Sequence, residues 1–377
     1  MAKKSKLQTE NLPKGISPRI NENRYLGRVT YKGKTYIEYD TNVGRLERTL
    51  NQLRKDLEAG KDVEARNQTL NEWFDTWMKV YKSKTVKIGT YENYRRHYNY
   101  YVRESIGKKK LKDVNIDDIQ GLLNSFSDRG FSTGMIKLVI ATLNGCFRKA
   151  IMKRMLEFNP VEYAEIPMAK EKKESFVLTV EMQKVFMLYA KESYLYPLFK
   201  LGLMSGTRNG EIRGFCWRDI DLENRELNVN HTIIWIEGQG NYLDLPKTKA
   251  SKRSIPLNDD MLSLLNELKQ GADDMGLGEP DNYVFCLPDG KPISRYRVTS
   301  ELNRIQERMK KEGYQVEHFT CHALRHTYST RATEKGVEYQ NLKKLLGHSQ
   351  LSMTMDLYSH VTDDVKRAEM NKLNGVF

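Results

Sequence analysis

Residues suited to phosphate chemistry gather near the carboxyl end of the chain. His322, Arg325 and His326 lie within five positions of one another, and His348 follows, with Tyr358 ten positions after it. Arginine and histidine side chains can neutralise the charge of a phosphodiester, and a tyrosine phenol can supply an oxygen nucleophile. This combination predicts the attack of a tyrosine on a phosphodiester.

A second arginine suited to anion binding lies upstream, in the segment Gly206-Thr-Arg208-Asn-Gly-Glu211. We expect one helix to end at the glycine and another to begin beside Arg208, where free backbone N–H groups favour an anion. Arg208 could then contribute to a phosphate site. An ion pair with Glu211 and nothing more is the alternative interpretation.

Four cations crowd one loop between two predicted strands, and they are Lys247, Lys249, Lys252 and Arg253. The tip of a hairpin of this kind is usually only a basic surface in contact with solvent. A lysine on a mobile β-turn can also reach into a groove and donate a proton to a leaving alkoxide. The loop therefore offers a candidate general acid.

Composition favours a polyanionic partner, although charge alone is weak evidence. The 377 residues include 62 Lys and Arg against 49 Asp and Glu, which gives a formal charge of +13 at pH 7. The four cysteines form no C-x-x-C pair, so neither a disulfide framework nor a zinc knuckle is indicated. The first residues lack the apolar core of a signal peptide, and no run of about eighteen apolar residues occurs. We therefore expect a soluble protein of the cytoplasm.

Residues 1–66 are predicted to form a small domain. Aromatic and β-branched residues mark two strands, 24–31 and 34–39, on either side of a Lys-Gly turn. Leucines at helical spacing then indicate one helix that ends near Gly60. A β-ribbon can enter the major groove of DNA, and the candidate DNA-binding residues of this one are Arg24, Arg28, Lys32 and Lys34. A packing appendage without DNA contacts is the alternative.

Residues 67–170 are predicted to be all-helical. Thr69 and Glu72 form a capping box, a second helix begins near Thr90, Asn115 caps a third, and a fourth covers 133–155. Tyrosines of the second helix follow the helical period, which favours core positions over a base-stacking platform, and they are Tyr91, Tyr94, Tyr98 and Tyr101. The basic residues between them are candidates for contact with a DNA backbone, and they are Arg95 and Arg96.

Residues 171–377 are predicted to mix helices and strands, after a polar linker at 168–178. Helices are expected at 179–190 and 195–204, and strands at 227–236, 242–245 and 253–257 in a small antiparallel sheet. The remainder is predicted to be mostly helical. The fold class is thus a multidomain α/β protein. It combines a small hairpin or sheet with one helix, an all-α bundle, and a mixed, mainly helical domain.

The order and spacing of these motifs closely resemble the tyrosine recombinase family, the phage-type integrases. The shared features are Arg208 in G-x-R-x-x-E, Lys247 on a β-turn, His322-x-x-Arg325, Leu-Gly-His348 and Tyr358. The match runs from about residue 175 to residue 365, and residues 67–170 resemble the family's core-binding domain more weakly. Residues 1–66 look like the arm-binding domain of integrases from phages and conjugative transposons.

The resemblance implies a role for each matching residue. Tyr358 would attack the scissile phosphorus, form a 3′-phosphotyrosyl link and free a 5′-hydroxyl. Arg208 and Arg325 would hold the non-bridging oxygens as negative charge builds on them. His322 and His348 would donate further hydrogen bonds or assist proton transfer.

The resemblance also implies an acid and two supporting residues. Lys247 would protonate the departing 5′ oxygen, and the Lys-Thr that follows Leu-Pro favours it over Lys249. Glu211 would orient Arg208 without contacting the phosphate itself. His326 would be structural and lie near the site.

Two competing assignments fit the sequence less well. Arg213 and Arg218 lie close to Arg208, but only Arg208 fits G-x-R-x-x-E. His322 and His326 could share a helix face as metal ligands, yet neither H-E-x-x-H nor a third ligand at a familiar spacing is present. No metal is expected. No nucleotide cofactor is expected either, since the tyrosyl bond keeps the phosphodiester energy.

The implied outcome is integration and excision of a mobile element or prophage through a Holliday junction. The chain would bind core-type and arm-type sites on double-stranded DNA and form a homo-tetramer on synapsed DNA. An excisionase and a DNA-bending host protein are expected partners. The chain is not expected to attach to a membrane, and its expected location is the bacterial cytoplasm, in association with the nucleoid. A Xer-like resolvase with the same chemistry and a non-catalytic DNA-binding protein on the same scaffold are the alternatives.

The last residues carry an apolar stripe at roughly helical spacing, composed of Val361, Val365, Met370 and Leu373. Such a helix can cover its own domain. The family resemblance favours packing on a neighbouring protomer of a DNA-bound tetramer.

Overall fold

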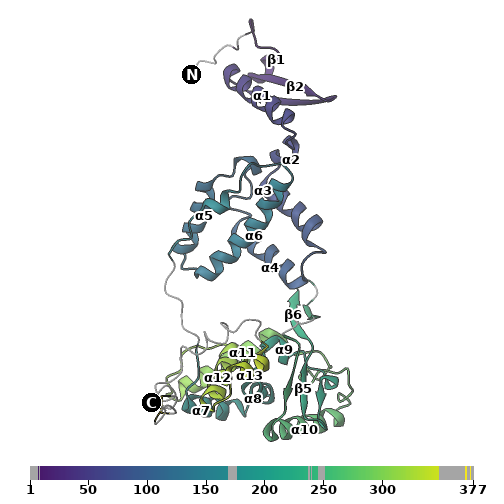
Figure 1. Ribbon diagram of the computed structural model, residues 1–377, viewed down its shortest axis with the longest axis vertical. Coiled ribbons are helices and arrows are strands. Elements are labelled where there is room, and N and C mark those ends of the chain that lie inside the picture. The colour runs from purple at the N-terminus through teal and green to yellow at the C-terminus, as the bar shows by residue number, and fades with distance from the viewer. Residues whose placement is uncertain are drawn as a thin grey trace. The chain divides into compact units, whose positions relative to one another are not determined.

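The computed structural model of this protein describes residues 7, 9–168, 176–236, 238, 240–244, 251–347, 370, 371 and 374. The chain separates into two compact units, residues 1–172 and 173–377, which are taken here one at a time (Figure 1). No helix in these described stretches is long and apolar enough to cross a membrane.

A three-stranded antiparallel sheet opens the first unit, and one helix covers a face of it (Figure 1). The elements are β1 (Ile16–Arg19), η1 (Ile20–Glu22), β2 (Arg24–Tyr31), β3 (Lys34–Asp40) and α1 (Val43–Glu58). Lys32 and Gly33 have φ of 47° and 81°, the conformation that lets a two-residue turn match the twist of its strands. The predicted hairpin and helix are confirmed. The sequence pattern did not indicate β1, a four-residue strand that contains Pro18.

Leucines of α1 pack on the inner face of this sheet, where Leu46 and Leu50 are buried. Gly27 of β2 lies directly beneath them. A methyl group at this position would approach Leu50 Cδ1 to 2.8 Å, so the helix packs closely because the strand has no side chain there. On the opposite face, Arg28 pairs in register with Ile37, and both side chains are exposed.

Helices form the rest of the first unit. They are α2 (Val63–Asn67), α3 (Leu70–Thr76), η2 (Trp77–Lys82, a π-helical turn), α4 (Ile88–Tyr101), η3 (Leu111–Asp113), α5 (Ile116–Asp128), α6 (Thr133–Met152) and η4 (Pro160–Tyr163). The capping box of Thr69 and Glu72 and the cap at Asn115 are both confirmed. The long helix α6 ends three residues before the predicted Met155, because Arg154 adopts a left-handed backbone with φ of 57°.

The tyrosine stripe of α4 belongs to the core of the bundle, as its spacing predicts. Tyr98 is fully buried and stacks on Phe74, with ring centroids 3.6 Å apart. Its hydroxyl donates to Asn71 Oδ1 over 2.9 Å, which satisfies the one polar atom of the ring. The partly buried members pack against the same core, and they are Tyr91, Tyr94 and Tyr101.

The second unit is mainly helical, with two small sheets. Its helical elements are α7 (Val180–Ala190), α8 (Tyr196–Ser205), α9 (Asn209–Ile212), η5 (Trp217–Asp219), α10 (Asp259–Asp274), α11 (Arg295–Lys311), α12 (Cys321–Glu334) and α13 (Tyr339–Leu346). Its strands are β4 (Ile220–Asp221), β5 (Glu226–Val229), β6 (Thr232–Ile236), β7 (Gly240–Asp244) and β8 (Arg253–Pro256). Part of the predicted linker already belongs to this unit, since Leu178 is buried and its N–H donates to Thr327 Oγ1 over 3.0 Å.

The prediction of a continuous strand at 227–236 is wrong. It divides into β5, which pairs with β4 and β8, and β6, which pairs with β7 in a separate two-stranded sheet. The buried carboxylate of Asp219 lies at the break. Asn230 Nδ2 donates to its Oδ1 over 3.0 Å, and His231 Nδ1 lies 3.5 Å from its Oδ2. These contacts turn the chain between the two strands.

The loop that holds the four cations is not the tip of a hairpin. The strands before and after it are β7 and β8, which pair with β6 and β5 and not with each other. The loop therefore links two sheets of the second unit. Residues 245–250, including Lys247 and Lys249, lie outside the described residues.

The capping box of α3 gives a test of this part of the fold. Thr69→Ala should lower the free energy of unfolding of the first unit by about 1 kcal/mol, because the Glu72 N–H loses its side-chain acceptor. Urea unfolding of the full chain, followed by circular dichroism, would measure this change. Thr76→Ala in the same helix is the matched control, since Thr76 donates only to the Glu72 carbonyl. Equal effects of the two substitutions would contradict the assignment.

Candidate active site

Arg208 lies between the end of one helix and the start of the next, as predicted. α8 ends at Ser205, Gly206 takes the left-handed conformation, and α9 begins at Asn209. The Arg208 backbone N–H donates to Glu211 Oε2 over 2.9 Å. Because α9 is a single turn of four residues, its dipole contributes little to the electrostatic potential here, and the charge of the Arg208 side chain contributes most of it.

Gly206 is required at this turn for two reasons. Its φ of 62° is a conformation that residues with a Cβ atom rarely adopt. A Cβ atom would also lie 2.3 Å from Cδ1 of Tyr328, which packs against this turn from α12. The Gly206 carbonyl faces the interior of the domain, where it accepts a hydrogen bond from an arginine of α12.

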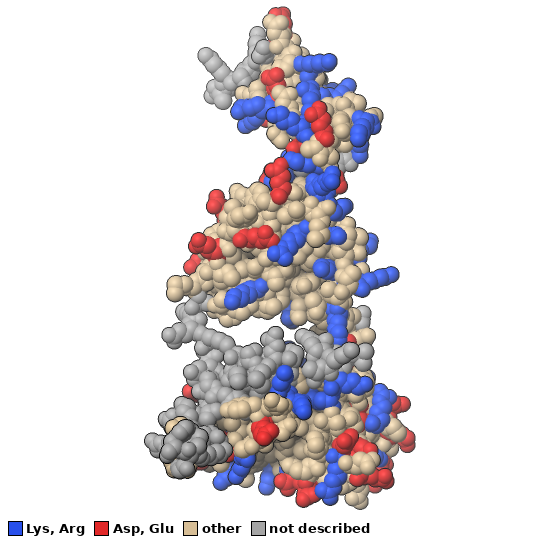
Figure 2. Space-filling model, in the orientation of Figure 1, with Lys and Arg blue, Asp and Glu red and all other residues tan. Residues whose placement is uncertain are grey.

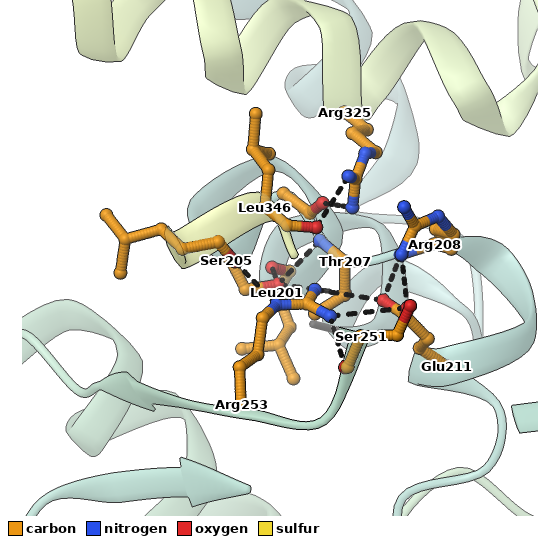
Figure 3. Close-up of polar contacts among 11 residues, drawn as sticks. Leu201, Ser205, Thr207, Arg208, Glu211, Ser251, Arg253, Arg325 and Leu346 are labelled. Carbon is orange, nitrogen blue, oxygen red and sulfur yellow. Dashed lines mark hydrogen bonds and ion pairs between the residues drawn. The ribbon is translucent and has the colours of Figure 1, made fainter. Parts of the chain in front are cut away.

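That arginine is Arg325, which is almost completely buried. Its Nη1 donates to Gly206 O over 2.8 Å and its Nη2 donates to Leu346 O over 2.7 Å (Figure 3). Both acceptors lie at the carboxyl ends of helices, α8 and α13, where free carbonyls favour a cation. Burial lowers the pKa of Arg325 to about 9, and the nearby Arg208 charge acts in the same direction. The guanidinium therefore remains charged at neutral pH.

Glu211 is buried between two arginines (Figure 3). Its Oε1 accepts from Arg208 Nη1 over 2.7 Å, and its Oε2 accepts from Arg253 Nη2 over 3.0 Å. Burial alone would raise the pKa of Glu211. The hydrogen bond and charge of Arg253, together with the charge of Arg208, outweigh burial and hold the pKa below its ordinary value. One carboxylate thus fixes two guanidinium groups.

Arg253 is the residue of this cluster that sequence analysis missed as a site residue. Its place in the cation-rich loop predicts a side chain in contact with solvent, whereas only 5% of the Arg253 side chain is exposed. The signal was present in the strand, because Arg253 alternates with the buried Ile255 and Leu257 and therefore lies on the inward face of β8. Lys252, which has the opposite orientation, is exposed.

His322 and His326 lie one turn apart on α12, with ring centroids 4.5 Å from each other in an edge-to-face arrangement. Thr320 caps this helix, and His322 follows in its first turn. The pKa of His322 lies below its ordinary value, first because protein atoms displace water around the ring and then because Arg325 and Arg208 are close. His322 is therefore neutral at neutral pH, with one nitrogen able to donate and the other able to accept.

The two arginines considered as competitors of Arg208 are engaged elsewhere. Arg213 is buried, and its guanidinium donates to the carbonyls of Ile293 and Ile233 over 3.0 and 3.1 Å. Arg218 forms an ion pair with Asp281 at the surface. Among these three arginines, Arg208 is the one grouped with Arg325.

The structure therefore brings together five of the predicted site residues, which are Arg208, Glu211, His322, Arg325 and His326. The remaining catalytic candidates lie outside the described residues, and they are Lys247, His348 and Tyr358, together with the alternative acid Lys249. The described chain ends its continuous course at Gly347, whose left-handed backbone terminates α13 immediately before His348. The predicted DNA-binding residues of residues 1–170 belong to the first unit.

This arrangement suits a dianionic or transition-state phosphate group. About one third of the Arg208 side chain is exposed, beside the buried Arg325 and the neutral His322. Fixed cations next to a low-dielectric interior stabilise developing negative charge more strongly than mobile cations in water do. The charge and burial of these residues are thus suited to binding an anion.

Family models match two segments of the chain. The model described as the phage integrase family matches residues 177–364, which contain the whole cluster. The model described as the phage integrase N-terminal SAM-like domain matches residues 69–127, within the helical bundle.

Curated relatives extend over nearly the full chain. It is 30% identical over 383 aligned residues to a protein named tyrosine recombinase XerC-like from Caldanaerobacter subterraneus subsp. tengcongensis, covering 95% of this chain and 94% of the relative. It is 24% identical over 340 residues to the transposase from transposon Tn916 of Enterococcus faecalis, covering 87% of this chain and 83% of the relative.

Solved structures share the fold. The Tn1549 transposon integrase in complex with transposon right end DNA matches with a TM-score of 0.69 at 23% identity, over 82% of this chain and 100% of that chain. A lambda integrase tetramer bound to a Holliday junction matches with a TM-score of 0.59 at 24% identity, over 93% and 96%. Given the family-model match over residues 177–364 and the 30% identity that covers 95% of this chain and 94% of the relative, this protein belongs to the phage integrase family of tyrosine recombinases.

Proposed function

We propose that the cluster of Arg208, Glu211, His322 and Arg325 is the phosphate-binding part of the recombinase active site. The observation that carries this proposal is the pair of guanidinium groups of Arg325, which is buried, and Arg208, which is partly exposed. Glu211 accepts a hydrogen bond from Arg208, and the Gly206 carbonyl accepts one from Arg325. Within the described residues, Arg325 uses one N–H of each terminal nitrogen on a carbonyl, so N–H groups remain for phosphate oxygens. The DNA in the structures of the Tn1549 and lambda integrases agrees with this substrate.

The proposed reaction cleaves one strand by exchange of esters. Tyr358 Oη attacks the scissile phosphorus and forms the 3′-phosphotyrosyl bond as the bond from phosphorus to the 5′ oxygen breaks. The phenol proton passes to a neutral histidine, for which His322 is suited by its lowered pKa. Lys247 gives a proton to the departing 5′ oxygen. Attack of a 5′-hydroxyl from the partner strand reverses these steps and rejoins the DNA.

The remaining assignments complete the site. His348 follows Gly347 directly and would donate to a non-bridging oxygen together with the arginines. His326 would hold the His322 ring in place by the edge-to-face contact. Lys249 is the alternative acid. Residues 171–377 would form the catalytic domain with its carboxyl-terminal tail.

We propose that residues 1–66 are the arm-type DNA-binding domain. On the face of the sheet opposite α1, Arg28 is exposed and Arg24 lies over the Tyr39 ring, 4.2 Å from its centroid. Lys32 and Lys34 are exposed at the turn of the hairpin. Lys and Arg side chains predominate on the side of this sheet and helix that Figure 2 shows. A basic ribbon of this kind suits the major groove.

Residues 67–170 would be the core-binding domain. Arg95 pairs with Glu92 over 2.7 Å and Arg96 donates to Asn93 over 2.9 Å, so both side chains have polar partners one turn earlier on α4. Exchange of these partners for phosphate oxygens would release counterions and make binding dependent on salt.

On synapsed core sites the protein would act as a homo-tetramer that integrates and excises a mobile element, with an excisionase and a DNA-bending host protein as partners. A bacterial cytoplasm, in association with the nucleoid, is the expected location.

The nucleophile assignment can be tested on a nicked suicide substrate. The unaltered chain should accumulate a covalent protein–DNA adduct, and Tyr358→Phe should form none, because the variant lacks the attacking oxygen while it keeps the ring. Denaturing gel electrophoresis of labelled DNA measures the adduct, and filter binding provides the control for DNA affinity. An adduct formed by Tyr358→Phe would refute the assignment.

Deletion of residues 363–377 tests the proposed packing of the tail between protomers. Tetramer assembly on DNA and strand exchange should both be lost, while cleavage of a single suicide site is kept. Sedimentation of the protein–DNA complex measures assembly. If the truncated chain assembles and recombines normally, the tail packs on its own domain.

Glu211→Gln tests whether the carboxylate supports the arginines. At pH 7 the variant should lose about 3 kcal/mol of the free energy of unfolding of the second unit, because a buried Arg253 is left without its counter-charge. The exposed Glu223→Gln is the matched control and should change stability by less than about 0.5 kcal/mol.

We expect the difference in the free energy of unfolding between Glu211→Gln and the unaltered chain to depend on pH. The pKa of Glu211 is lower in the folded chain, so its stabilising effect is present above its unfolded pKa of about 4.3 and is lost as pH falls through the folded pKa. Urea unfolding at several pH values should show the two chains converging below about pH 4. A constant difference throughout would refute the ion pairs.

A further inference from the structure

Arg253 connects the two halves of the phosphate-binding cluster. On one side its Nη2 and Nη1 donate to Glu211 Oε2 and Oε1 over 3.0 and 3.3 Å. On the other side its Nε donates to the Leu345 carbonyl over 2.6 Å (Figure 3). A fourth hydrogen bond, from Nη1 to Ser251 O over 3.1 Å, holds the guanidinium against the residues that lead into β8.

The contacts with Glu211 and with Leu345 lead to the two arginines that are proposed to bind the phosphate. Glu211 also accepts from Arg208, so Arg253 fixes the carboxylate that orients Arg208. Leu345 immediately precedes Leu346, whose carbonyl accepts from Arg325. Arg253 and Arg325 therefore hold consecutive carbonyls at the end of α13.

Arg253 is itself unsuited to contact DNA. Only 5% of its side chain is exposed, and its donors are directed at a carboxylate and two carbonyls. A lysine at this position could neutralise Glu211, but it has one nitrogen and cannot span Glu211 and Leu345 with the planar fork of a guanidinium. The contacts of Arg253 with Glu211 and Leu345 therefore depend on the planar shape of the guanidinium as well as on its charge.

We infer that Arg253 is a positioning residue for strand cleavage, which sets Arg208 through Glu211 and the end of α13 through the Leu345 carbonyl. This inference rests on the proposed function. It predicts that Arg253→Lys slows the formation of the tyrosyl adduct without weakening DNA binding. We expect a decrease of about tenfold to a hundredfold in the single-turnover rate constant, as for loss of one charge-assisted hydrogen bond.

The experiment uses the full chain and a nicked suicide substrate at saturating protein. The rate constant of adduct formation is measured separately from its final amount, and DNA affinity is measured by titration. A chain that is only partly folded would yield less adduct at an unchanged rate constant, so a loss of amplitude alone would overturn the inference. An unchanged rate constant and amplitude would overturn it as well.

A second variant separates positioning from general destabilisation. If Arg253 acts through Glu211, the double variant Glu211→Gln/Arg253→Lys should react at the rate of the slower single variant, within about threefold. Multiplied effects would mean that the two residues act independently, which would contradict the inference.

The matched control is Arg331→Lys. Arg331 is partly buried in the second unit, where its Nη2 donates to Leu178 O over 2.7 Å and its Nη1 pairs with Glu334, so these contacts do not involve Arg208 or Glu211. Its rate constant should stay within about twofold of the unaltered chain. An equal loss in this control would overturn the inference. If the unaltered chain forms no adduct, the proposed function fails, whereas a normal rate of Arg253→Lys alongside a normal parent refutes only the inference.

Discussion

The candidate site places several arginine charges in the protein interior, and it depends on a carboxylate and backbone carbonyls that compensate these charges. Arg208, Arg253 and Arg325 lie in one cluster, and the charges of the other two lower the pKa of Arg325 after burial itself. Glu211, the carboxylate of this cluster, is shared by two of them. Backbone carbonyls at the ends of α8 and α13 accept from the third. Without these acceptors, buried cations would cost several kcal/mol each.

This constraint explains why distant segments must meet at one point. Four segments each supply a donor or an acceptor of the cluster, and none of them forms it alone. They are the turn after α8, the start of β8, α12 and the end of α13. Gly206 allows the approach, because any side chain would collide with Tyr328. The helix ends serve as acceptors because the last carbonyls of a helix have no intrahelical partners, and left-handed turns at Gly206 and Gly347 end α8 and α13 at this point.

Local signals predicted much of the fold, and their failures have a common cause. The capping box at Thr69, the Lys32-Gly33 turn and the helical period of the tyrosines depend on neighbours within a few residues, and these predictions are confirmed. The break between β5 and β6 depends on Asp219, and the pairing of β8 depends on β5, more than twenty residues earlier. Alternation along a strand cannot reveal such partners.

The sequence by itself determined the family of this protein and predicted its chemistry, because Arg208, His322, Arg325 and Tyr358 match the family's motifs in type, order and spacing. Only the tertiary structure decided which cations belong to the site and which to the surface. Arg253 and Arg213 are buried among carbonyls and a carboxylate, while Arg218 and Lys252 are exposed. Their charge is the same in the sequence, but burial depends on acceptors contributed by segments far along the chain.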